Sequence, residues 1–293
     1  MTLARAAPAI FVLLWSTGWI APVYAMGHAS AQLFLSVRFG FALVAFILFS
    51  LLSGARWPRT GAAMLHGIVS GMLLHGVYLG GVWWAIFNGV PAAMSGVIAA
   101  LQPLATAALV PWLVNERLSR GQLAGLFLGF LGILLALSPS FQGVSADVLA
   151  KTAFPFIVNI VAMSGQVLGA IYQKKYLQTG DLRTNAVFQY VGALLVMVPL
   201  AFLVEPPFFD FSLQLWLVVA WSVLGLSMGG VGLYLYLIRR GQVSGAASLM
   251  YLIPPTVAVE SLIFLGEPLS WTMMAGTLIV VIGVWLANRR PSV

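Results

Sequence analysis

Apolar runs long enough to cross a bilayer recur along the whole chain, and this pattern limits its fold more than any other feature. A transmembrane helix needs about 20 predominantly apolar residues. Of the 293 residues, 61% are hydrophobic and only 7% are charged, whereas soluble domains carry about 25% charged residues. A soluble globule would still need a polar shell, so the sequence predicts an all-α membrane protein that crosses the bilayer many times.

Ten transmembrane helices are predicted, separated by short turns that contain Gly, Pro or charged residues. None of the connections is long enough to hold a soluble domain. The first run has no small-residue cleavage pattern after it, so we expect a retained helix and not a signal peptide. The predicted helices cover 8–26, 31–53, 61–87, 92–114, 120–137, 151–172, 183–204, 211–238, 243–265 and 270–287.

Basic residues fall almost entirely on one side of this predicted topology. If the N-terminus is cytoplasmic, twelve of the fourteen Lys and Arg lie in cytoplasmic segments, Lys151 lies outside and Arg38 lies within a helix. Cytoplasmic loops of membrane proteins carry such an excess. We therefore expect both termini to be cytoplasmic, and we attribute the net charge of +7 to topology and not to nucleic-acid binding.

Two short segments, NERLS at Asn115–Ser119 and GEPLS at Gly266–Ser270, repeat the same context 151 positions apart. The same offset gives eleven identities over residues 101–136, more than apolar composition would readily give. The chain is therefore predicted to consist of two repeats of five helices. The predicted repeats are 1–142 and 143–293.

Because five is odd, the second repeat must enter the membrane from the opposite side. The charge distribution agrees, since it puts Glu116 inside and Glu267 outside. Inverted repeats are typical of secondary transporters that work by alternating access, with the substrate between the repeats near the midplane. A duplication kept only for packing is the alternative. Ser119 and Ser270 fit the N-caps of the helices that follow, and Gln122 completes a capping box in the first copy.

Nearly the whole chain carries the motifs of one transporter family. The motifs are LLWSTGW, LSVRFGFAL, LQPLATAALVPWLVNERLSRGQLAGLFLGFLGI and, in the second half, YLIPPTVAVESLIFLGEPLSWTMMAGTLIVVIGV. They resemble EamA-type members of the drug/metabolite transporter superfamily. The aromatic-rich segment LLHGVYLGGVWWAIFNGVPA looks most similar to YddG-type exporters of aromatic amino acids. The resemblance implies a multi-pass transporter of a bacterial inner membrane, with the first, third, fourth, sixth, eighth and ninth helices around the pathway.

No catalytic arrangement is visible in the sequence. The chain has no cysteine, which excludes disulfides and thiolate chemistry. The three histidines, His28, His66 and His75, have no partner at metal-binding spacing, and no phosphate-binding loop or nucleophile elbow occurs. We expect no enzymatic activity, no cofactor and no metal site.

Polar and aromatic residues predicted near mid-membrane are the candidates for the substrate pathway. His75 and Tyr78 are three residues apart and share one helix face. A histidine at that depth is costly unless it lines a wet cavity or is hydrogen-bonded within the bundle, and both interpretations stay open. Asn159, Met163 and Gln166 are spaced i, i+4, i+7 and share a face. The remaining candidates are Trp15, Gln102, Tyr234, Ser244 and Tyr251.

Two prolines and one arginine are predicted to have mechanical roles. Pro103 and Pro254 occupy equivalent mid-span positions, where proline opens the hydrogen bonding of a helix. We expect a paired hinge, with a simple packing kink as the alternative. The resemblance implies a structural or gating role for Arg38. A pair with Glu260 at similar depth is a further hypothesis, and snorkelling or capping of carbonyls are its alternatives.

Such a lining suits a neutral amino acid with an aromatic or apolar side chain, because aromatic ring faces attract both rings and an ammonium group. We therefore expect export of such amino acids by alternating access. Other small metabolites or drugs, or a membrane protein without transport, are the alternatives. The expected partners are the substrate and the lipid bilayer. Helices 120–137 and 270–287 are expected to be peripheral scaffold; a monomer is expected, and a homodimer contact through them stays open.

Overall fold

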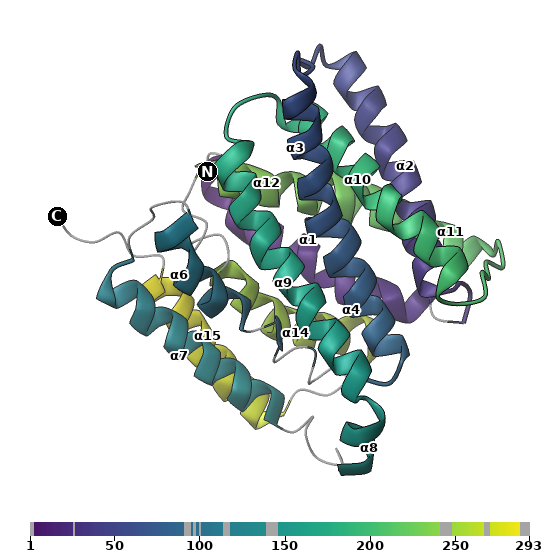
Figure 1. Ribbon diagram of the computed structural model, residues 1–293. Helices are drawn as coiled ribbons and strands as arrows, with labels where there is room; N and C mark the ends of the chain where they lie inside the picture. Colours follow the sequence, from purple (N-terminus) through teal and green to yellow (C-terminus); the bar gives the residue numbers. More distant parts are fainter. Residues whose placement is uncertain are drawn as a thin grey trace.

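The computed structural model describes residues 3–25, 27–90, 95, 98–99, 101–113, 118–138, 146–240, 248–266 and 270–287 (Figure 1). Within these residues the chain is helical, and its one strand-like pairing is an isolated antiparallel bridge between Ala29 and Phe209. Seven helices of the described residues are long and apolar enough to cross a membrane, and two shorter apolar helices cover 249–264 and 271–287. The predicted all-α membrane fold is confirmed.

Most predicted helices are present with their ends shifted by a few residues. The helix predicted at 92–114 is described only in part, and α8 forms in a connection that was predicted to be a loop. The first half contains α1 (Leu3–Ala25), α2 (Ala31–Leu52), α3 (Gly61–Gly71), the π-helical segment η1 (Met72–Val77), α4 (Tyr78–Phe87), α6 (Gln102–Leu113) and α7 (Arg120–Leu137). The second half contains α8 (Ala146–Lys151), α9 (Ala153–Tyr176), α10 (Leu182–Leu203), α11 (Leu213–Trp221), the π-helical segment η3 (Ser222–Val231), α12 (Gly232–Arg240), the 3₁₀ segment η4 (Leu249–Leu252), α14 (Ile253–Leu265) and α15 (Trp271–Ala287).

The long helices of the first half recur 151 positions later in the second half. Under this offset α2 matches α10 at both ends, while α1, α6 and α7 match α9, α14 and α15 to within one residue. The third helix of each half is interrupted by a π-helical segment at overlapping positions, η1 in one half and η3 in the other. The two halves therefore share one helical plan, including its departure from α-helical geometry.

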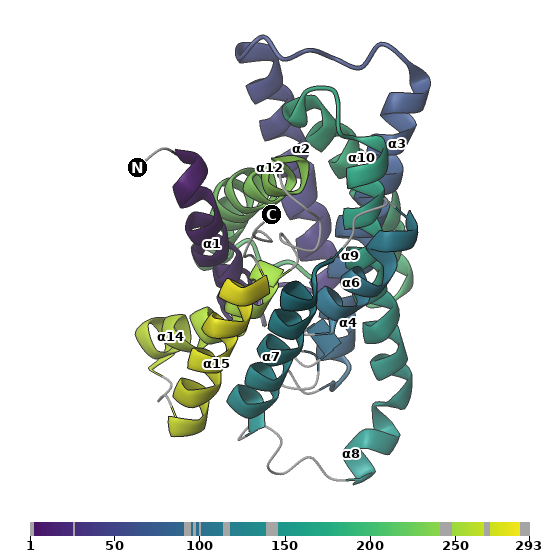
Figure 2. The same ribbon diagram turned by 90° about the vertical axis from the view of Figure 1, so that its left-hand side faces the viewer.

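Helices α7 and α15 pack side by side along their length at one edge of the bundle (Figures 1 and 2). A Cβ atom at Gly125 would lie 2.4 Å from the Ala287 backbone nitrogen, and one at Gly276 would lie 2.5 Å from the Ala136 nitrogen. Under the offset Gly125 corresponds to Gly276 and Ala136 to Ala287. The two contacts are therefore equivalent, and they join antiparallel helices. This is the arrangement that inverted repeats produce.

Helices α2 and α10 form a second pair of equivalent helices. Phe39 and Tyr190 are equivalent under the offset, and their ring centroids lie 5.8 Å apart. Ala42 and Ala193 are also equivalent, and both are fully buried. The pairing of equivalent residues places this contact on the axis that relates the two repeats.

Loop contacts tie the repeats together at the end of the bundle that carries residues 27–30, which the charge distribution predicts to face outside. We call it the outer end. His28 forms an ion pair with Asp210. The Ser30 nitrogen donates to the Phe208 carbonyl oxygen at 2.9 Å, and the Gln32 nitrogen donates to a Glu205 carboxylate oxygen at 2.8 Å.

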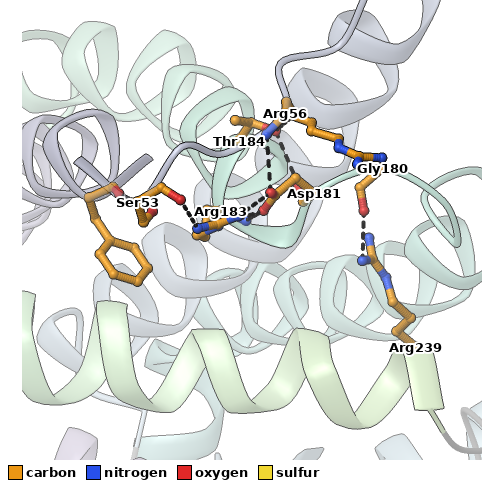
Figure 3. Close-up of polar contacts among 8 residues, drawn as sticks. Ser53, Arg56, Gly180, Asp181, Arg183, Thr184 and Arg239 are labelled. Carbon is orange, nitrogen blue, oxygen red and sulfur yellow. Dashed lines mark hydrogen bonds and ion pairs between the residues drawn. The ribbon is translucent and has the colours of Figure 1, made fainter. Parts of the chain in front are cut away.

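An equivalent set of contacts lies at the opposite end, which we call the inner end (Figure 3). Asp181 caps α10 and accepts hydrogen bonds from Arg183 Nε at 2.9 Å and from the Arg56 nitrogen at 3.2 Å. Arg239 donates to the Gly180 carbonyl oxygen at 2.7 Å. The hydrogen bond from the Arg183 side chain is the largest cause that lowers the pKa of Asp181 to about 2. The carboxylate is therefore ionised over the physiological range.

The predicted caps of the two repeated turns are confirmed. Ser119 Oγ accepts from the Gln122 nitrogen at 3.2 Å, and the Gln122 side chain accepts from the Ser119 nitrogen at 2.8 Å, which is a complete capping box. Ser270 Oγ accepts from the Met273 nitrogen at the start of α15. Glu116 and Glu267 lie outside the described residues.

Candidate substrate-binding site

A cavity of about 160 Å³ lies between α1, α2, α4 and η3. Trp15 and Trp19 line it from α1, and Tyr78 and Trp83 line it from α4. Arg38 of α2 also lines it, and the remaining lining residues are aliphatic, glycine or phenylalanine. We call this space the aromatic cavity. Its chemistry suits a small molecule with an apolar or aromatic body.

The aromatic cavity opens toward the outer end. Val23 near the end of α1 and Phe87 at the end of α4 both line it, and they are 47% and 38% exposed. Under the offset these residues correspond to Lys174 of α9 and Ile238 of α12. Ile238 is only 1% exposed, and Lys174 Nζ donates to its carbonyl oxygen at 3.2 Å. The equivalent described positions at the inner end are therefore packed together.

Two predicted pathway residues, Trp15 and Tyr78, line the aromatic cavity, and Tyr234 lies behind it. The Tyr234 ring is 5.3 Å from the Trp15 ring and 5.6 Å from the Phe11 ring, centroid to centroid. Tyr234 is buried and is equivalent to Trp83 under the offset. It supports the wall that Trp15 presents to the cavity.

His75 does not line the aromatic cavity. Its ring stacks on Tyr190 of α10, with centroids 5.0 Å apart and an interplanar angle of 3°. Phe39 lies at 6.0 Å on the α2 side. The histidine is buried and its Nε2 atom has no hydrogen-bond partner among the described residues. Of the two interpretations that the sequence left open, these contacts favour packing, although without the expected hydrogen bond.

Gln102 and Met163 belong to a different space, a groove of about 510 Å³ between α6 and α9. Gln102 Nε2 lies 2.8 Å from Met163 Sδ. Leu101 and Leu168 line the groove and are 43% and 44% exposed, so it opens sideways on the bundle. The sequence put Gln102, Met163 and Tyr78 in one pathway, and the structure separates them into two spaces.

Of the other predicted pathway residues, Asn159, Gln166 and Tyr251 are buried outside both spaces. Asn159 and Gln166 share the α9 face with Met163, and neither side-chain amide has a hydrogen-bond partner among the described residues. Tyr251 is buried against Gly129 of α7, where an added Cβ atom would lie 2.6 Å from the tyrosine ring. Ser244 lies outside the described residues.

The two prolines occupy equivalent positions at the starts of helices. Pro103 is the second residue of α6, and Pro254 is the second residue of α14, directly after the 3₁₀ segment η4. A proline in the first turn of a helix interrupts no hydrogen bond of that helix. The change of geometry in the second repeat therefore comes before Pro254.

The hypothesis of an ion pair between Arg38 and Glu260 is wrong. Arg38 Nε donates to Ser227 Oγ of η3 at 3.2 Å. Glu260 Oε1 lies 2.6 Å from Ser16 Oγ of α1. The two residues have similar depth but face different neighbours, because α14 packs mainly against α1.

Among the residues that line the aromatic cavity, sequence reasoning missed Trp19. It is four residues after Trp15, so helical spacing could have placed both indoles on one face. The described residues contain no group of three His, Asp or Glu that could hold a metal ion.

Comparison with known proteins gives one consistent result. Residues 7–138 and 154–289 match the model of the EamA-like transporter family. An uncharacterized transporter of Bacillus subtilis is 26% identical over 96% of this chain and 90% of its own. A probable amino-acid metabolite efflux pump of Salmonella typhimurium is 24% identical over 94% of this chain and 92% of its own. A crystal structure with 21% identity superposes with a TM-score of 0.78 over 96% of this chain and 95% of that chain, which shows the same fold.

Proposed function

The chain belongs to the EamA-like transporter family, and we propose that this membrane transporter exports aromatic and other apolar or neutral amino acids across a bacterial inner membrane. The aromatic cavity carries the proposal, because five aromatic side chains surround a space that opens toward the outer end. Its volume of about 160 Å³ is small beside the roughly 300–1,000 Å³ of pockets for drug-sized ligands. This size favours a metabolite over a large drug. The curated name of the Salmonella relative, an amino-acid metabolite efflux pump, supports the same direction.

We propose alternating access between the repeats 1–142 and 143–293 as the mechanism. The cavity is open toward the outer end, while the equivalent positions at the inner end are packed. An inverted repeat can exchange these two arrangements, since each half can adopt the conformation of the other. The conformation described here then corresponds to the state open to the outside, with both termini in the cytoplasm.

In this mechanism the residues buried away from the aromatic cavity serve the inward-open state. Asn159 and Gln166 support this proposal, because their amide groups are buried without a partner among the described residues. Buried amides without a partner cost free energy, so a conformation that exposes them to ligand or water would satisfy them. The same proposal covers Gln102, Met163, Tyr234 and Tyr251, as well as Ser244, which lies outside the described residues, with Pro103 and Pro254 as the paired hinge. His75 is left out of this set, because its stack on Tyr190 supports a packing role.

Transport by the purified protein in liposomes tests the proposed function. We expect uptake of labelled phenylalanine and tryptophan above that of empty liposomes, and no uptake of labelled glucose. Trp15→Ala, which removes a cavity wall, should lower phenylalanine uptake about tenfold or more. The matched control is Trp112→Ala, because Trp112 is 86% exposed on α6. Uptake of glucose but of no amino acid would contradict the proposal.

A further inference from the structure

Arg38 is the one charged side chain among the described residues that line the aromatic cavity. It lies in α2 about two turns from the outer end of the helix and is 5% exposed. A buried guanidinium without a counter-charge is costly in a low-dielectric interior. The residue therefore needs a partner that offsets this cost.

The described residues offset only part of the cost of burying the Arg38 guanidinium. Arg38 Nε donates to Ser227 Oγ at 3.2 Å, and the guanidinium carbon lies 5.8 Å from the centroid of the Phe39 ring. Among the described residues no carboxylate lies within ion-pair distance of Arg38. The two terminal NH₂ groups make no hydrogen bond to the described chain, and the side chain borders the cavity. Four of the five N–H donors of the guanidinium are left for a ligand.

An arginine with this geometry selects carboxylates. The planar guanidinium presents two parallel N–H donors that match the two oxygens of a carboxylate, and such bidentate pairs are strong in dry surroundings. The ring walls of Trp15, Trp19 and Tyr78 would hold the apolar part of the same molecule. No carboxylate among the described lining residues is available for an ammonium group.

We propose that Arg38 is the carboxylate-binding residue of the aromatic cavity, and that the substrates are small aromatic or apolar carboxylic acids, with or without an α-amino group. The inference rests on the proposed export function and narrows it. Recognition depends on the carboxylate and the apolar body, whereas the ammonium group of an amino acid contributes little. Arg38 thus contacts the substrate and is more than a structural or gating residue.

Ligand binding to the purified protein in detergent at pH 7.5 tests the assignment independently of transport. The probes are phenylalanine, 3-phenylpropionate, phenylalaninamide and phenethylamine, and the readout is the rise in melting temperature. Phenylalanine and 3-phenylpropionate are expected to stabilise the protein at similar concentrations. The amide and the amine, which lack a carboxylate, should need at least tenfold higher concentrations. Equal effects of the acids and the amines would overturn the proposal.

Variants at Arg38 give a second test. Arg38→Gln should remove the preference for acids over amines, and Arg38→Lys should keep the charge but weaken 3-phenylpropionate binding, because a lysine cannot form the bidentate pair. The control is Arg59→Gln, since Arg59 is exposed at the inner end. Loss of stability in Arg38→Gln with the acid preference intact would show a purely structural role and overturn the proposal.

The same protein in liposomes separates the failure of this inference from that of the proposed function. Inhibition of labelled phenylalanine uptake by 3-phenylpropionate, but not by phenethylamine, supports both. If phenethylamine inhibits phenylalanine uptake as strongly as 3-phenylpropionate does, export remains supported. The carboxylate-binding role of Arg38 is then overturned. Stabilisation by carboxylic acids without any amino-acid transport would keep the role of Arg38 and overturn amino-acid export.

Discussion

At the scale of single residues, the Ser16 hydroxyl of α1 lies between two acceptor oxygens. Its Oγ atom is 2.6 Å from Glu260 Oε1 and 3.0 Å from the Leu13 carbonyl oxygen. Ser16 Oγ donates to Glu260 Oε1 and also approaches the Leu13 carbonyl oxygen, so its single proton is shared between two acceptors. The contact joins α1 to α14, and no described cation lies within ion-pair distance of Glu260.

Substitution of Glu260 tests this arrangement. Glu260→Gln keeps an acceptor oxygen for Ser16 at the same place, so the melting temperature should change little. Glu260→Ala removes the partner of Ser16 and leaves a cavity between α1 and α14, which should cost about 1–3 kcal/mol and lower the melting temperature by several degrees. Thermal unfolding in detergent measures both. A glutamine variant as unstable as the alanine variant would show that the ionised carboxylate is required.

His75 and Tyr78 are predicted to differ in their effect on transport. His75→Phe preserves the stack on Tyr190 and removes a buried nitrogen that has no described partner, so stability and phenylalanine uptake should stay near wild type. Tyr78→Ala removes part of the cavity wall and should lower uptake about tenfold. The measurement is uptake per folded protein in liposomes. A folded His75→Phe protein without uptake would assign the histidine to the pathway.

At the scale of helices, the contrast between these two residues has a geometric cause. The sequence places them on one face because residues three apart share a face of an α-helix. His75 lies in the π-helical segment η1, and Tyr78 begins α4 directly after it. A π-helix has i→i+5 hydrogen bonds and hence more residues per turn, so residues three apart diverge. One side chain therefore reaches α10 and the other reaches the cavity.

The sequence predicts helices well where a long apolar run ends at polar turn residues, as for α2 and α7. It does not predict η1, because the wider turn depends on a neighbour. Segment η1 packs on α9 at Gly165, where an added Cβ atom would lie 3.0 Å from the Leu73 carbonyl oxygen. The site is only partly predictable for the same reason: periodicity defines the face that contains Asn159 and Gln166, but not the helix that this face meets.

The contact between α7 and α15 is predicted to tolerate no added side chain. Gly276→Ala would place a Cβ atom 2.5 Å from the Ala136 nitrogen, which is backbone and can move only with its helix. We expect a loss of about 1–3 kcal/mol, seen as a lower melting temperature. Gly40→Ala on α2 is the control, because nothing lies within 4 Å of the added atom there. Equal stability of the two variants would contradict the close contact.

The Asp181 contacts at the inner end predict a pH dependence of stability (Figure 3). Hydrogen bonds from Arg183 lower the pKa of Asp181 to about 2 in the folded protein, against about 3.9 for an unperturbed aspartate. The carboxylate therefore stabilises the fold above about pH 4, and this contribution disappears as the pH falls toward 2. Asp181→Asn should melt below wild type at pH 7, and the difference should shrink near pH 3.

The control for this prediction is Asp147→Asn, which removes an exposed carboxylate from α8. Its melting temperature should follow wild type at both pH values. If the difference in melting temperature between wild type and Asp181→Asn stays constant from pH 7 to pH 3, the charge of Asp181 does not contribute to stability.

At the scale of the whole molecule, a polar contact distinguishes the two entrances of the inverted repeat. Lys174 Nζ donates to the Ile238 carbonyl oxygen and joins α9 to α12 at the inner end. Val23, the equivalent of Lys174 at the outer end, has no side-chain donor that could form this bond with Phe87. In the proposed alternating access, the contact therefore favours the conformation that is closed inside and open outside, and opening toward the cytoplasm requires that Lys174 release α12.

Cysteine labelling can measure the exchange between the outward-open and inward-open conformations, because the natural sequence contains no cysteine. A maleimide should react quickly with Val23→Cys and slowly with Ile238→Cys. Adding Lys174→Met should raise the rate at position 238 by up to about tenfold, since losing a charged hydrogen bond worth ~1.5 kcal/mol shifts a two-state population by that factor. The rate at position 23 should fall at the same time, because opening inside closes the outer entrance. Lys175→Met, on the exposed neighbour, should change neither rate. Faster labelling at both positions would indicate general loosening of the bundle, which is incompatible with alternating access through this contact.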